Sequence, residues 1–222
     1  MIPFVNIHTH NNRHKGEYIE IVDLSKIDPN ISTSEIPAFS AGLHPWYIDI
    51  DNYELQLKQV YEKAILPGCM AIGECGIDKQ IDIGLETQKT IFLQQINYAI
   101  QLRKPVIVHC VRAYDVLISM AKKYTHKVAF IVHGYNKNIQ VAHQLINSGL
   151  FLSFGEAICN IKHKKIIDVF KHIPTHKILL ETDDANITIE QVYNAAAVLH
   201  NCSLNEMKEI IYNNYKHIFI DE

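Results

Sequence analysis

The sequence predicts an α/β fold, a single (β/α)8 (TIM) barrel that takes up residues 1–222. Eight short apolar segments have the length of strands, and helical periodicity fills most of the intervals between them. Several of these segments are almost continuously apolar, as in Val106-Ile107-Val108, which is typical of parallel strands that are covered on both faces. Strands that alternate with helices in this way indicate a barrel, and no linker, low-complexity tract or internal repeat divides the chain.

The elements follow in order along the chain, and one interval departs from the pattern. Strands are expected over 4–8, 18–23, 37–43, 69–74, 105–110, 127–133, 150–154 and 177–182. Helices are expected over 52–64, 88–102, 113–124, 140–147, 164–172, 189–200 and 204–212. Between the first and third strands, 11–17 is too short for a covering helix, and 25–30 has turn composition before a short helix from Ser32. We therefore expect a barrel trimmed between strands 1 and 3.

Composition limits the functional classes. Hydrophobic residues make up 48% of the chain and charged residues 20%, as in ordinary globular proteins. The net charge of −3 argues against a generally basic nucleic-acid binder but leaves room for a local positive groove. The five cysteines show no paired spacing, and we find no signal peptide or long apolar span. These observations predict a cytoplasmic protein without membrane association, and they indicate no obligate protein partner.

Side chains that can bind metals recur where the predicted strands end. His8 and His10 are two residues apart at the end of the first strand, so both project from the same face. In a barrel the active site lies at the carboxyl ends of the strands. A single histidine there is more often a hydrogen-bonded structural residue, but six candidates at one end of one barrel predict a metal site. The six are His8, His10, Glu74, His109, His133 and Asp183.

Four histidines and two carboxylates can hold two divalent cations, with Glu74 as a bridge between them. Mixed nitrogen and oxygen ligands suit Zn²⁺, Mn²⁺ or Mg²⁺ and do not choose among them. Paired ions can activate water to hydroxide and stabilise an in-line displacement at phosphorus. Asp183 could bind one ion and also accept a proton from the attacking water. We therefore expect Glu74 and Asp183 to be the catalytic carboxylates.

Other residues near these strand ends have two interpretations each. Asp78 could orient a metal ligand or cap a turn. Trp46 and Tyr47 could stack on a base at the mouth of the site, although burial beneath the following helix is more common for such a pair. Cys75 and Cys110 adjoin proposed ligands, but strand alternation turns them to the opposite face, which favours core packing.

The order of these motifs resembles that of the TatD-type deoxyribonucleases of the amidohydrolase superfamily, over nearly the whole chain. The motifs are His8-Thr9-His10, Gly42-Leu43-His44-Pro45, Gly73-Glu74-Cys75-Gly76-Ile77-Asp78, Val108-His109-Cys110, Val132-His133-Gly134 and Glu181-Thr182-Asp183. The resemblance implies a metal-dependent hydrolase whose partner is DNA and which cleaves phosphodiester bonds, at strand ends or in single strands.

The resemblance also implies roles for individual residues. One ion would be surrounded by His8, His10, Glu74 and Asp183, and the other by Glu74, His109 and His133. His44 and Arg112 would contact the substrate phosphate.

Two other functions use the same residues. A hydrolase of the amidohydrolase superfamily could act on a small lactone, amide or phosphoester, and a binding or accessory subunit could keep the metal cage without turnover. The glutamate at the fourth strand and the His44-Pro45 motif favour the nuclease, and the complete set of ligands argues against the accessory subunit.

Overall fold

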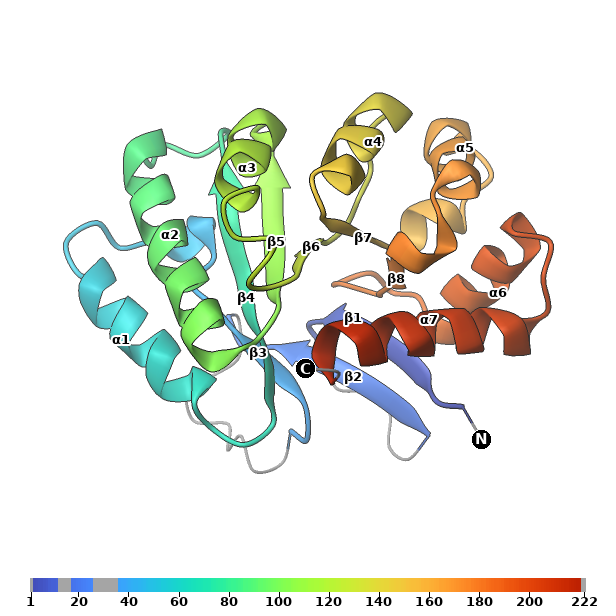
Figure 1. Cartoon of the computed structure of the whole chain (residues 1–222), viewed down its shortest axis with the longest axis horizontal. Coiled ribbons are helices and arrows are strands. Elements are labelled where there is room, and N and C mark those ends of the chain that lie inside the picture. Colours follow the sequence, from blue (N-terminus) through green and yellow to red (C-terminus); the bar gives the residue numbers. More distant parts are fainter. Residues whose placement is uncertain (1, 12–16, 26–35, 221–222) are drawn as a thin grey trace.

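The protein forms one barrel-like sheet of eight parallel strands with helices outside it (Figure 1). The computed structural model describes residues 2–11, 17–25 and 36–220. The strands are β1 (Phe4–Thr9), β2 (Tyr18–Asp23), β3 (Phe39–Ala41), β4 (Cys69–Asp78), β5 (Val106–Val111), β6 (Phe130–Val132), β7 (Phe151–Phe154) and β8 (Ile178–Leu180). Neighbours pair in chain order and in parallel throughout. This arrangement confirms the predicted (β/α)8 fold.

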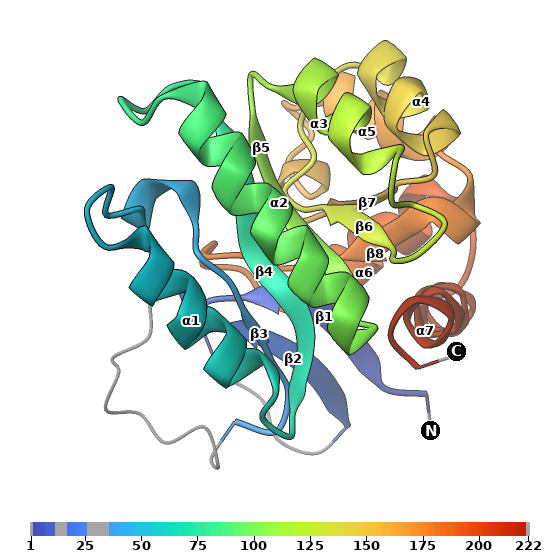
Figure 2. The ribbon, with the colours of Figure 1, turned by 60° about the vertical axis from the view of Figure 1, so that its left-hand side comes forward.

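Seven α-helices are seen in the described residues, on the outside of the strands. They are α1 (Tyr53–Ala64), α2 (Leu85–Leu102), α3 (Tyr114–Ala121), α4 (Ile139–Asn147), α5 (Lys164–His172), α6 (Ile189–Leu199) and α7 (Leu204–Phe219). Figure 2 shows α1 and α2 side by side over the sheet, and α1 contacts β3 while α2 contacts β4. None of these helices has both the length and the hydrophobicity that a bilayer crossing requires.

Some element boundaries differ from those expected. β4 continues to Asp78 instead of ending at Glu74, because Cys75 to Asp78 pair with the far end of β5. α7 continues to Phe219 instead of Tyr212, because its last turns still bury Tyr215 and the Asn214 amide donates to the carbonyl of Ile178 at 2.7 Å. The two asparagines at 213–214 interrupt the apolar pattern of the helix, so the sequence did not predict that it continues.

The trimming between strands 1 and 3 is visible in the spacing of the strands. β1 ends at Thr9 and β2 begins at Tyr18, which is too short a connection for a helical crossover between parallel strands. Segments 12–16 and 26–35, with the short helix expected from Ser32, lie outside the described residues.

β1 and β8 meet along a narrow seam. An isolated bridge joins Thr9 to Asp183 at the carboxyl end of the barrel. Near the amino-terminal end of β1, the Tyr193 hydroxyl of α6 accepts a hydrogen bond from the backbone N–H of Val5 at 2.9 Å and donates one to the Val5 carbonyl at 3.1 Å. A side chain therefore supplies the hydrogen bonds that a neighbouring strand would otherwise give to Val5.

The buried side chain of Asn6 crosses the same seam. Its Oδ1 accepts from the backbone N–H of Thr182 at 3.0 Å, and its Nδ2 donates to the Thr182 hydroxyl at 2.9 Å. The chain segment that leads into Asp183 is thus held against β1 by side-chain bonds.

Candidate metal centre

The carboxyl ends of the strands converge on the buried carboxylate of Glu74. Its Oε2 lies 3.4 Å from Nε2 of His8 and 3.9 Å from Nε2 of His10. Asp183 closes this side, with its Oδ1 at 3.6 Å from Nε2 of His8 and 3.2 Å from Nε2 of His10. The four residues grouped by the sequence resemblance around one ion therefore lie together.

The other oxygen of Glu74 faces a second group of imidazoles. Oε1 lies 2.7 Å from Nδ1 of His109, 2.8 Å from Nε2 of His133 and 3.1 Å from Nε2 of His44. Each carboxylate oxygen thus faces its own set of nitrogen donors. We refer to His8, His10, Glu74, His109, His133 and Asp183 as the candidate metal centre.

Two glycines allow β4 to bring Glu74 so close to β5. Gly73 and Gly76 have φ values of +153° and +152°, in a region that side chains rarely adopt. A Cβ on Gly76 would lie 2.0 Å from the carbonyl oxygen of His109, and one on Gly73 would lie 2.6 Å from that of Ile107. A β-carbon at either position would push the two strands apart and move Glu74 away from His109.

Asp183 reaches the centre from a left-handed backbone conformation, with φ of +53°. Such a conformation costs about 1 kcal/mol or more for a residue that is not glycine. Backbone bonds hold it there, because the N–H of Asp183 donates to the carbonyl of His8 at 3.0 Å and the N–H of His10 donates to the carbonyl of Asp183 at 3.1 Å. The Asp183 side chain is 36% exposed, whereas that of His8 is fully buried. Asp183 is therefore the carboxylate that a substrate could reach.

The centre concentrates buried charge. Burial alone would lower the pKa of His8, but the carboxylates of Asp183 and Glu74 raise it to about 10. Burial would likewise raise the pKa of Glu74, but His133 and His109 hold it well below its usual value. Without a bound cation, protonated histidines balance the carboxylates, and a divalent ion could take over that role.

The donor atoms fit a divalent metal. Both ring nitrogens of His8 and the Nδ1 atoms of His10 and His133 are buried and make no hydrogen bond within the described structure. Ligand atoms within 4.8 Å of one another form, among other sets, the triads His8–His10–Asp183 and His8–Glu74–His133. Neutral imidazole and carboxylate are the ligands that Zn²⁺, Mn²⁺ and related ions accept in such sites. The residues present therefore fit the metals that the sequence predicts.

Asp23 belongs to the same cluster, although no role was expected for it from the sequence. It ends β2, is fully buried, and accepts the backbone N–H of Glu74 through Oδ1 at 2.9 Å. Its Oδ2 lies 3.4 Å from Nδ1 of His10 and accepts a hydrogen bond from the Ser25 hydroxyl. The signal was present in the sequence, because Asp23 is an acidic residue at a predicted strand end.

Two further carboxylates support histidines of the centre. Glu181, which also had no assigned role, accepts the backbone N–H of Gly134 at 2.6 Å and lies 3.6 Å from Nδ1 of His133. It stands two residues before Asp183, and this spacing was the available signal.

Asp78 makes the contacts that both of its interpretations require. Its Oδ2 lies 3.4 Å from Nε2 of His109, and its Oδ1 caps a turn by accepting the N–H of Gln80 at 2.8 Å. The indole N–H of Trp46 donates to Oδ2 at 2.7 Å, which fixes the carboxylate beside His109.

Comparison with known proteins identifies the family. Residues 22–220 match the sequence profile of the TatD related DNase family. The chain belongs to this family. An uncharacterized metal-dependent hydrolase of Buchnera aphidicola is 30% identical over 150 residues, which cover 65% of this chain and 54% of that protein. The 3'-5' ssDNA/RNA exonuclease TatD of Klebsiella pneumoniae is 27% identical over 148 residues, which cover 65% of this chain and 56% of that protein.

The likeness extends to three dimensions. The crystal structure of YjjV, a TatD homologue from Escherichia coli K12, matches with a TM-score of 0.72 and 25% identity over 86% of this chain and 80% of that one. Several curated TatD relatives are longer proteins, since the matches span 54% to 64% of the first of them. TatD-family membership and the barrel are thus shown for this chain, which is shorter than those relatives.

The two predicted substrate residues of this TatD-family chain differ in position. His44 lies in the cluster, and its Nδ1 accepts the backbone N–H of Trp46 at 3.0 Å, so in the neutral ring the proton sits on Nε2 and faces Glu74. Burial lowers the pKa of His44, which favours this neutral donor form. Arg112 is exposed just after β5 with φ of +52°, and within the described residues its side chain has no hydrogen bond or ion pair to the cluster.

Helix α2 positions two of the strand ends through buried glutamines. Gln95 accepts the N–H of Leu43 at 2.7 Å and donates to its carbonyl at 3.2 Å. Gln88 accepts the N–H of Asp78 at 2.8 Å and donates to its carbonyl at 3.0 Å. Two side chains on one face of α2 thus fix the backbone beside His44 and at Asp78.

Proposed function

We propose that this chain is a divalent-metal-dependent hydrolase that cleaves phosphodiester bonds of DNA, at strand ends or in single strands. The observation that carries the proposal is that the two oxygens of Glu74 face two separate groups of histidines, with Asp183 at one of them. This is the arrangement expected of a carboxylate that bridges two metal ions. The Klebsiella pneumoniae relative is named as a 3'-5' ssDNA/RNA exonuclease, which supports the choice of substrate.

In this proposal His8, His10, Glu74 and Asp183 hold one ion, and Glu74, His109 and His133 hold the other. Bound divalent ions supply an acidified water and offset the negative charge of the phosphate oxygens. Three further carboxylates orient the imidazole rings of these ligands. Asp23 contacts His10, Asp78 contacts His109, and Glu181 contacts His133.

Two residues move or hold protons at the phosphate. Asp183 is the most exposed carboxylate of the centre and accepts the proton of the attacking water at its carboxylate oxygen. His44 is neutral with its proton on Nε2, and it donates that hydrogen bond to a phosphate oxygen in place of Glu74.

Aromatic side chains beside the site suit a nucleic-acid substrate. Contrary to the commoner outcome considered for them, Trp46 and Tyr47 are not buried beneath a helix but are 56% and 39% exposed. Their rings lie 5.0 Å and 5.5 Å from the ring of His44. A base next to the scissile phosphate can stack on such a surface. All five cysteines are free thiols, which agrees with a proposed cytoplasmic location.

The decisive experiment measures DNA hydrolysis by metal-stripped protein after Mg²⁺, Mn²⁺ or Zn²⁺ is added back. We expect metal-dependent release of nucleotides from single-stranded DNA, and a loss of at least about a hundredfold in the Glu74→Gln variant because one bridging oxygen is replaced by an amide. Exposed Glu86 on α2 provides the matched control, and Glu86→Gln should retain wild-type activity.

Metal binding itself gives a second readout. Because the pKa of His8 is about 10 without metal, a metal ion must displace a proton, so binding releases protons and tightens as the pH rises. Calorimetry in buffers of different ionisation enthalpy measures this release. If the wild-type protein binds metal fully and leaves DNA intact, the nuclease proposal is wrong. Turnover of lactones, amides or simple phosphoesters would then indicate the small-substrate hydrolase, and no turnover would indicate the accessory subunit.

A further inference from the structure

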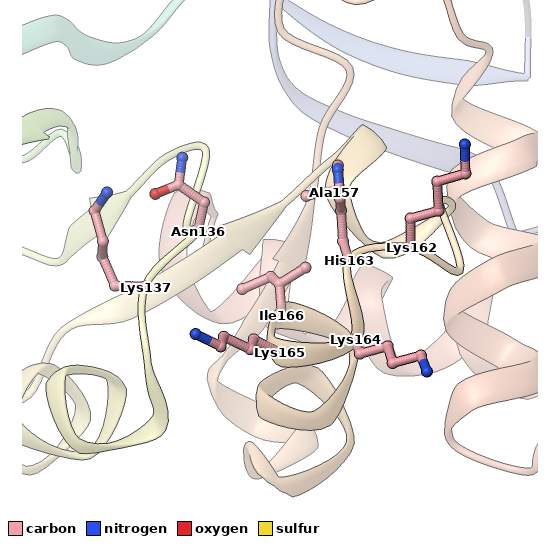
Figure 3. Close-up of a pocket in the computed structure, with 8 residues that line it drawn as sticks. All are labelled: Asn136, Lys137, Ala157, Lys162, His163, Lys164, Lys165 and Ile166. Atoms are coloured by element: carbon pink, nitrogen blue, oxygen red, sulfur yellow. The ribbon is translucent and has the colours of Figure 1, made fainter.

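A cavity of about 690 Å³ lies between the loop after β6 and the first turn of α5, and basic side chains surround it (Figure 3). Asn136 and Lys137 come from the β6–α4 loop. Lys162, His163, Lys164 and Lys165 come from the loop after β7 and from the start of α5. In Figure 3, Lys165 extends toward the loop that carries Lys137. We call this site the lysine cavity.

The lysine cavity is positive in a chain that is acidic as a whole. The sequence has 24 acidic and 21 basic residues, yet four lysines and no acidic residue line this site in the described structure. All four are exposed, and none of them forms an ion pair with a carboxylate in the part of the chain that the structure describes. Their charge is therefore available to an anionic ligand.

The cavity lies at the same end of the barrel as the candidate metal centre. Asn136 follows His133 by three residues, which can span at most about 11 Å. The connecting backbone is fixed, because the N–H of Gly134 donates to Glu181 at 2.6 Å and the N–H of Tyr135 donates to the carbonyl of Ser153 at 2.9 Å. The distance between the two sites is thus set by rigid structure.

The start of α5 adds to the attraction for anions. The first three residues of this nine-residue helix line the cavity, so its amino-terminal end, which carries a partial positive charge, faces the ligand. Beside it, the side chain of Ile161 is 82% exposed and could contact a base. Positive charge on two separate loops suits an extended anion with several phosphates better than a single small one.

We propose that the lysine cavity binds the phosphate backbone of a single-stranded nucleic acid, a few nucleotides away from the phosphate held at the candidate metal centre. This inference rests on the proposed function and adds a second contact for the same strand. The two contacts together favour longer strands over dinucleotides and place the strand across β6 and β7.

The test compares binding by metal-loaded protein of a fluorescent single-stranded oligonucleotide with phosphorothioate linkages, which keep the charge and resist cleavage. We expect the variant Lys137→Gln/Lys165→Gln to bind about tenfold more weakly at low salt, with a salt slope smaller by about 0.7 for each lost contact. The control Lys58→Gln/Lys171→Gln removes two exposed lysines on α1 and at the far end of α5, and it should bind like the wild type.

The outcomes separate the two proposals. Equal strand binding by the cavity variant and the wild type overturns the cavity proposal, whatever the hydrolysis assay gives. Equally tight binding of inorganic phosphate, a dinucleotide and the oligonucleotide also overturns it, because a single phosphate group would then account for all of the binding. Weaker strand binding by the cavity variant supports it, and absence of hydrolysis of an unmodified strand by wild-type protein that does bind overturns the proposed function alone.

Discussion

Asp23 illustrates how a single side chain can fix two parts of the candidate metal centre. One carboxylate oxygen accepts the backbone N–H of Glu74, and the other lies against His10. Its charge favours the imidazole orientation in which Nε2 points at Asp183. Such supporting carboxylates commonly contribute a factor of 10 to 100 in metal affinity.

We expect Asp23→Asn to weaken metal binding by about 10- to 100-fold while leaving the fold intact. The amide oxygen can still accept the N–H of Glu74, but the negative charge beside His10 is lost. Metal affinity measured by competition with a chromogenic chelator checks this, with Asp168→Asn on the exposed face of α5 as the control. Unchanged affinity in Asp23→Asn would show that Asp23 serves the backbone only.

At the level of residues, the sequence predicts the candidate metal-ligand side chains better than the carboxylates that hold those side chains in place. The six metal-ligand candidates come together as expected, because the carboxyl halves of parallel strands meet at one end of a barrel, although Glu74 lies in the middle of β4 and not at its end. Asp23 also ends a predicted strand, but it lies outside the motifs that carry the family resemblance, and it was therefore given no role. Arg112 was chosen from resemblance alone, and in the described structure it is exposed and makes no hydrogen bond or ion pair to the cluster.

Helix α2 shows how one element sets the geometry of two others. Gln88 and Gln95 lie seven residues apart, hence on one face, and both are buried. Buried amides on an apolar helix face would be costly unless paired. Here each glutamine side chain pairs with the backbone N–H and carbonyl of one residue, Leu43 or Asp78. At these two points α2 therefore supplies hydrogen bonds that a neighbouring strand could otherwise provide.

The element-scale prediction concerns Gln95→Met, which keeps a similar volume and removes both hydrogen bonds. We expect a loss of about 2–4 kcal/mol in the free energy of unfolding, because the buried N–H and carbonyl of Leu43 both lose a partner. Urea denaturation measures it. Gln101→Met on the exposed side of the same helix removes only a bond to Tyr61 and should cost less than about 1 kcal/mol. Equal losses in the two variants would contradict this account.

At this scale the sequence predicts elements more reliably than their ends. Apolar runs such as Ile178-Leu179-Leu180 mark β8 correctly, because burial on both faces demands them. The far half of β4 was missed because glycines and polar residues interrupt its pattern, yet these are the residues that shape the site. The shortening between strands 1 and 3 was predictable from length alone.

The whole molecule depends on the seam at which β8 meets β1. Within the described residues, backbone pairing between these strands is confined to the bridge at Thr9 and Asp183 and the hydrogen bonds beside it. The remainder is held by the Tyr193 hydroxyl on Val5 and by the Asn6 side chain on Thr182. Helices α6 and α7 pack against both strands and cover this seam.

We expect Tyr193→Phe to destabilise the barrel by about 1–3 kcal/mol, since it leaves the buried N–H and carbonyl of Val5 without a partner while the ring packing is kept. Thermal and urea unfolding provide the measurement. Tyr61→Phe, at an exposed hydroxyl on α1, should be near neutral. A neutral Tyr193→Phe would mean that other groups can pair with Val5.

Because the seam closes the barrel, we expect the two groups of donors in the candidate metal centre to assemble at different stages of folding. The candidate ligands on β4, on β5 and just after β6 come from consecutive strands, whereas His8 and Asp183 meet only when segments 175 positions apart in the chain close the barrel. Long-range closure has a larger entropic cost and generally comes late. A chain caught before closure would hold the Glu74–His109–His133 donors already assembled and the His8–His10–Asp183 donors still apart. Under the proposed two-ion function, the ions would then be acquired in a fixed order, and occupancy of the second would report that the barrel is complete.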